Sequence, residues 1–124
     1  MRLIRLFSAG AILLLAAPSF AQEWIEYVDR KEFFQIKFPG QPTVKDITFK
    51  SEEGEDLPAK VYTAKEGPAT YSITVVNYKG AENWRGSMAW AAWNFRKRGG
   101  AVTYDAHVNS DRIAGHQLQI TNKD

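Results

Sequence analysis

Apolar and polar residues alternate in several short stretches of the chain, and this period of two is typical of β-strands with one buried face. The clearest stretch is 33–38, where Phe34, Ile36 and Phe38 share one face and polar residues occupy the other. Pro and Gly residues that favour turns follow it. The other stretches that predict strands are 43–50, 57–63, 71–78, 101–108 and 113–121.

The stretch 71–78 differs from the others because it is apolar on both faces. Ile73 and Val75 lie on one face, and Val76 and Tyr78 lie on the other. Strands that are covered on both sides lose their clean alternation. We therefore expect 71–78 to be the central strand of the sheet.

One segment, residues 87–98, has the pattern of an amphipathic helix. Ser87 suits the N-cap position, and Gly99 suits the left-handed position that follows a helix. At 100° per residue one apolar stripe forms, made of Met88, Ala91, Ala92 and Phe95. The order of elements predicts an α+β fold, in which this helix packs on one face of an antiparallel β-sheet.

Tryptophan is concentrated in and just before this helix. Trp90 and Trp93 fall away from the apolar stripe, and Trp84 precedes the helix. These side chains could form an aromatic platform for a ligand or a partner protein. Alternatively, a second layer of the core covers them, as it does most large apolar side chains.

The N-terminus has the features of a secretory signal peptide over residues 1–21. Arg2 and Arg5 precede an apolar run that is too short to span a membrane, and small residues stand before Gln22. Removal of this segment leaves 22–124 as a single domain without a membrane span, exported to the periplasm or secreted. Since the chain contains no cysteine, it has no disulfide and no thiolate site.

Arg2 and Arg5 also account for the formal net charge of +2, so the remainder of the chain is neutral. Proteins that bind nucleic acid usually carry a basic excess, and we therefore expect no nucleic-acid partner. At the other end, Asn122-Lys123-Asp124 is a turn-like sequence with no strand after it. This ending predicts that the domain is incomplete at its C-terminal side.

The string Phe34-Gln35-Ile36-Lys37-Phe38-Pro39-Gly40-Gln41-Pro42 follows the signal peptide and the Trp24/Tyr27 pair. It resembles the opening of small exported bacterial proteins that are distantly similar to PsbP-type domains. The resemblance implies an antiparallel sheet sandwiched with helices. It also implies further sheet after 113–121, and it transfers no catalytic residue to this chain.

One carboxylate and two imidazoles, Asp105, His107 and His116, are the ligand types of a non-haem metal site. Asp105 and His107 are two residues apart and share a strand face. A hairpin register that adds His116 to them would expose Leu118 and Ile120. We therefore expect a bulge at Gly115, which moves His116 off that face, and we predict no metal site.

The sequence shows no catalytic set that converges from separate elements. We therefore predict a non-enzymatic accessory or interaction module without a cofactor, whose partner is an unidentified envelope protein or small ligand. One alternative is a small-ligand-binding protein that uses the Trp90/Trp93 flank. Another is a metal-dependent or hydrolytic enzyme that acts through Asp105, His107 and His116.

Overall fold

The structure is a computed structural model and describes residues 23–122. The predicted signal peptide lies outside these residues. The described chain forms seven strands and one helix, in the order β1 (Ile25–Asp29), β2 (Phe34–Phe38), β3 (Thr43–Lys50), β4 (Asp56–Glu66), β5 (Ala69–Val76), α1 (Met88–Arg96), β6 (Ala101–Ser110) and β7 (Ile113–Thr121). Each predicted strand overlaps an observed one. Strand β1 is an additional strand that the alternation pattern did not predict.

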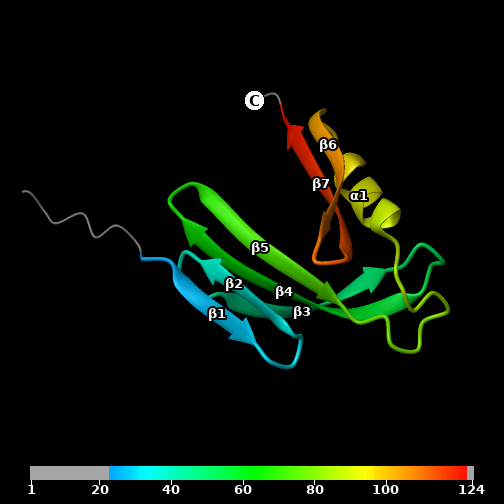
Figure 1. The fold of residues 1–124 in the computed structure, drawn as a ribbon, viewed down its shortest axis with the longest axis horizontal. Helices are drawn as coiled ribbons and strands as arrows, with labels where there is room; N and C mark the ends of the chain where they lie inside the picture. Colours follow the sequence, from blue (N-terminus) through cyan, green and yellow to red (C-terminus); the bar gives the residue numbers. More distant parts are fainter. Residues whose placement is uncertain (1–22, 123–124) are drawn as a thin grey trace, which may run out of the picture.

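The strands form three small antiparallel sheets instead of one (Figure 1). Strand β1 pairs with β2, β4 lies between β3 and β5, and β6 pairs with β7. Each ladder joins neighbours in the chain, because tight turns return each strand beside the previous one. The predicted α+β fold, with one main helix packed on the face of a sheet, is therefore wrong. The described chain is mostly strand, and α1 lies beside β7 across an open groove.

The central strand of the three-stranded sheet is β4, so the prediction that 71–78 is central is also wrong. Strand β5, which covers most of that stretch, is an edge strand. Strand β4 buries Leu57 and Ala59 on one face and Tyr62 and Ala64 on the other. Burial on both faces is what a central strand needs, and here it changes from one face to the other along the strand.

The main core lies where the β1–β2 hairpin packs against β4. Phe38 and Tyr62 are each only 1% exposed. The Phe34 and Tyr62 rings meet edge to face with centroids 4.9 Å apart, and the Tyr27 ring packs beside them. The Tyr62 hydroxyl donates a hydrogen bond of 2.6 Å to Asp29 Oδ2. Burial of the ring would otherwise leave the phenol hydroxyl without a hydrogen-bond partner.

The helix begins as predicted. The Ser87 side chain accepts a hydrogen bond from the Trp90 amide at 3.1 Å, which confirms it as the N-cap. Gly99 follows the helix with φ of 95°, a conformation that glycine adopts at little cost. The regular helix ends at Arg96, slightly before the predicted boundary of 98.

Two contacts connect α1 and the segment before it to the three-stranded sheet and the residues that follow it. The Trp90 indole donates a hydrogen bond of 2.8 Å to the Lys50 carbonyl at the end of β3. Before the helix, Gly86 (φ of 68°) lies against Tyr78, and a Cβ atom there would stand 3.1 Å from the ring. The helix is thus tied to the three-stranded sheet through its Trp90 side, which leaves its apolar stripe facing β7.

Candidate functional site

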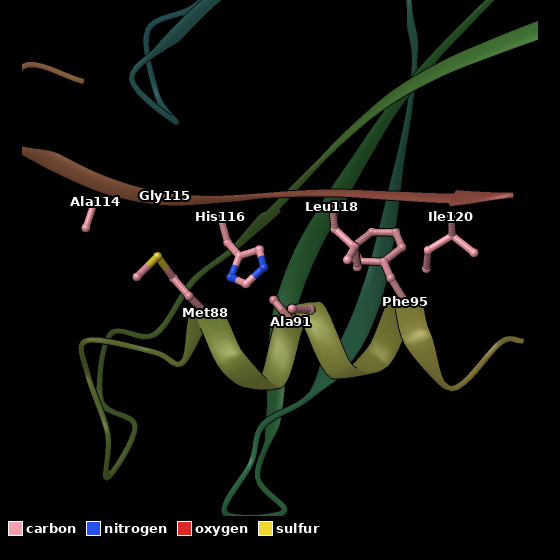
Figure 2. Close-up of a pocket in the computed structure, with 9 residues that line it drawn as sticks. Met88, Ala91, Phe95, Ala114, Gly115, His116, Leu118 and Ile120 are labelled. Atoms are coloured by element: carbon pink, nitrogen blue, oxygen red, sulfur yellow. The ribbon is translucent and has the colours of Figure 1, made fainter. Parts of the chain in front are cut away.

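An apolar groove of about 540 Å³ lies between α1 and β7. Figure 2 shows the helix stripe on one side and the side chains of β7 on the other. The lining residues are Met88, Ala91, Ala92, Phe95, Ala114, Gly115, His116, Leu118 and Ile120. The stripe predicted from the sequence therefore shares one face, and this face is directed to β7. Pockets for small ligands in proteins typically measure roughly 300–1,000 Å³.

The local sequence explains why the groove stays open. Ala91 and Ala92 are small, so the middle of α1 fills little of the space that separates it from β7. Ala92 is buried, whereas Met88 is 44% exposed and Phe95 is 55% exposed. A helix that closed onto its neighbouring strand would bury such side chains almost completely. The groove is consequently accessible from solvent.

The register of the β6–β7 hairpin directs His116, Leu118 and Ile120 to the helix. The turn residues Asp111 and Arg112 have φ of 50° and 68°, as in the two-residue turns that close hairpins. This turn places His107 opposite His116. The register irregularity lies between Val102 and Tyr104, so the predicted bulge at Gly115 is wrong. The sequence left the centre of the turn ambiguous, and one residue of shift exchanges the two faces.

As a result, Asp105, His107 and His116 do come together. His116 Nε2 lies 2.5 Å from Asp105 Oδ1, and the rings of His107 and His116 meet with centroids 4.7 Å apart. The other oxygen of Asp105, Oδ2, accepts a hydrogen bond from Arg96 of the helix. The hydrogen bond from His116 is the main cause that lowers the pKa of Asp105, and Arg96 adds to it.

This cluster holds α1 and β6 together instead of presenting a ring of ligands. Between residues 23 and 122, no three His, Cys, Asp or Glu side chains are arranged to hold a metal ion. His116 Nδ1 is shielded from solvent and has no hydrogen-bond partner among these residues. An unsatisfied buried nitrogen of this kind costs roughly 1–3 kcal/mol. Among the residues that line the groove, His116 is the one with an ionisable side chain.

The tryptophans lie away from the groove. Trp90 and Trp93 stack on each other with centroids 4.9 Å apart and an angle of 16°. The Lys97 ammonium lies 4.7 Å from the centre of the Trp93 ring. Trp84 is 66% exposed and stacks with Arg85. The structure thus places Trp90 and Trp93 together, while Trp84 stands apart from the helix face that they share.

Sequence reasoning identified the helix half of the groove but missed the half contributed by β7. The sequence predicted that Leu118 and Ile120 are core residues. One feature of the sequence nevertheless indicates open space at this position. Two adjacent alanines in the stripe face large residues on the strand, and this combination leaves space where both partners would normally interdigitate.

No helix among residues 23–122 is both long and apolar enough to cross a membrane. Comparisons of the chain with protein-family models, with curated proteins and with solved structures give no match. The resemblance to PsbP-type domains therefore stays a prediction, and the function has to be argued from the groove itself.

Proposed function

We propose that the protein is an exported, non-enzymatic binding module, and that the groove between α1 and β7 holds a small apolar ligand. The observation that carries this proposal is an accessible groove of about 540 Å³ with a predominantly apolar lining. Apolar surface that stays open in a folded domain usually marks a site of binding. The site differs from the Trp90/Trp93 flank that the sequence suggested.

The chemistry of the lining favours binding over catalysis. No hydroxyl or thiol side chain lines the groove, and its one ionisable side chain is His116. Its Nε2 atom is engaged with Asp105, and its Nδ1 atom is shielded from solvent. A general base has to reach the proton that it abstracts. Hydrolysis through Asp105, His107 and His116 is therefore not the function we propose.

A neutral fluorescent probe, N-phenyl-1-naphthylamine, tests this proposal because its emission rises in an apolar site. We expect saturable binding to the wild-type protein. Ala91→Leu places a larger side chain in the groove, where it occupies volume that the probe would fill, and we expect Kd to rise by roughly tenfold, which corresponds to about 1.4 kcal/mol. Leucine is also a good helix former, so the helix itself should remain intact.

Ala89→Leu is the matched control, since Ala89 is an exposed residue of the same helix that does not line the groove. It should bind the probe as the wild type does. Equal binding by Ala91→Leu and Ala89→Leu, or no saturable binding by the wild type, would contradict the proposed site.

A further inference from the structure

The two ends of the groove differ in charge. At one end Phe95 lies near Leu118 and Ile120, and at the other end Met88 lies near Ala114 (Figure 2). The three residues at the close of the helix, 96–98, are all basic. The hairpin turn beyond Ala114 contains one acid and one base, at positions 111 and 112. The positive charge is therefore concentrated at the Phe95 end.

Arg98 is placed to act on a molecule in the groove. Its guanidinium carbon lies 4.9 Å from the centre of the Phe95 ring, and Phe95 lines the groove. This stacking places the charged group beside a residue of the groove lining. A negative group at the end of a bound apolar chain would come within its reach.

Asp105, the acidic residue near the end of the helix, does not form an ion pair with Arg98. Both oxygens of Asp105 are occupied, since Oδ1 contacts His116 and Oδ2 contacts Arg96. The ion pairs found among residues 23–122 include neither Lys97 nor Arg98. Lys97 lies over Trp93, on the other flank of the helix. Among residues 23–122, Arg98 is thus the cation beside the groove that forms no ion pair.

We infer that the ligand is a single-chain anionic amphiphile, such as a long-chain carboxylate. Its apolar chain lies between α1 and β7, and its anionic head group pairs with Arg98. A groove with an apolar wall and a cation at one rim is complementary to this class of molecule. The inference rests on the proposed function and adds to it the identity and orientation of the ligand class.

Dodecanoate and dodecanol share a chain and differ in charge, so their comparison tests the head group. The affinity of each compound is measured by its displacement of the neutral probe, at concentrations below those at which the compound aggregates. We expect wild type to bind dodecanoate about fivefold more tightly at low salt, the upper range for an exposed ion pair. The preference should shrink in 1 M salt, where charges are screened within about 3 Å. Arg98→Gln should remove it, and Arg98→Lys should keep part of it.

Arg85→Gln is the matched control. Arg85 stacks on Trp84 in the same way, 4.9 Å from the ring centre, and does not line the groove. It should leave the preference for dodecanoate unchanged. If Arg98 serves only the dipole of the helix end, Arg98→Gln will alter helix stability and leave the preference intact, which overturns the inference.

Three further outcomes are decisive. Equal affinity for dodecanoate and dodecanol would refute the anionic head group while leaving the apolar groove as a ligand site. Failure of both chains and of the neutral probe to bind would refute the proposed function as well. Sedimentation with phosphatidylglycerol vesicles, without binding of free dodecanoate, would assign the basic end to a membrane surface and overturn the inference.

Discussion

The β1–β5 region and the α1–β7 region of this molecule differ in whether their apolar faces are buried. In the first region the β1–β2 hairpin closes over β4, and aromatic rings fill the space between them. In the second region α1 stands beside β7, and Ala92 is the residue that becomes buried. Figure 1 shows the two regions as separate groups of elements. One short chain therefore contains both a tightly packed apolar core and an apolar groove that stays open to solvent.

The difference separates a region whose packing should carry most of the stability from a region whose apolar surface stays open. Burial of apolar side chains is the largest favourable term in folding. The N-terminal region concentrates this burial in large rings such as Phe38 and Tyr62, and the C-terminal region leaves Phe95 and Leu118 in contact with an open groove. Regions with fewer buried contacts are also those that open locally and adapt to ligands.

The largest expected effect compares two phenylalanines. Phe38→Ala should lower the free energy of unfolding by about 3–5 kcal/mol, because it leaves a cavity in a filled core. Phe95→Ala should lower it by less than about 1 kcal/mol, since Phe95 is 55% exposed. Urea unfolding followed by circular dichroism measures both. Equal losses for the two variants would break the contrast between a closed and an open region.

A smaller effect concerns pH. Burial is the main cause that raises the pKa of Tyr62 above the ordinary value of 10.0, and its hydrogen bond to Asp29 acts in the same direction. Because the unfolded chain releases this proton first, the stabilisation is complete below pH 10 and decreases as the pH rises above it. We expect the urea midpoint to decline in that range.

Tyr62→Phe should make this alkaline decline shallower. Some decline should remain, because burial also raises the pKa of Tyr78. The urea midpoints of the two proteins, measured from neutral pH upwards, provide the comparison. Parallel curves would mean that Tyr62 does not hold its proton through burial in the N-terminal core.

The local elements of this fold were predictable from its sequence. Alternation located the strands from β2 onward, and Ser87 located the start of α1. The assembly of the sheets was not predictable, because the hydrophobic pattern of a strand does not specify which other strand it pairs with. Stretch 71–78 was apolar on both faces, yet β4 is the strand that lies between two others. Partial burial of edge strands can produce the same pattern as a covered central strand.

The candidate site was predictable in part. The stripe of α1 was evident from its period, but its partner surface depends on the register of β6 and β7. That register is set by the turn at Asp111 and Arg112, whose positive φ angles the sequence did not specify. The same turn brought His116 to Asp105, against the prediction. Small errors in the register of a hairpin therefore have large consequences for a site built on one of its faces.

The most direct test of the account is hydrogen–deuterium exchange with and without N-phenyl-1-naphthylamine. If the groove is the binding site, the probe should slow amide exchange in α1 and β7 and leave exchange in β4 unchanged. The reason is that a ligand stabilises the elements it contacts against local opening. Slower exchange in β4 alone, or no change in any segment at saturating probe, would contradict the claim that the open C-terminal region is the one that binds.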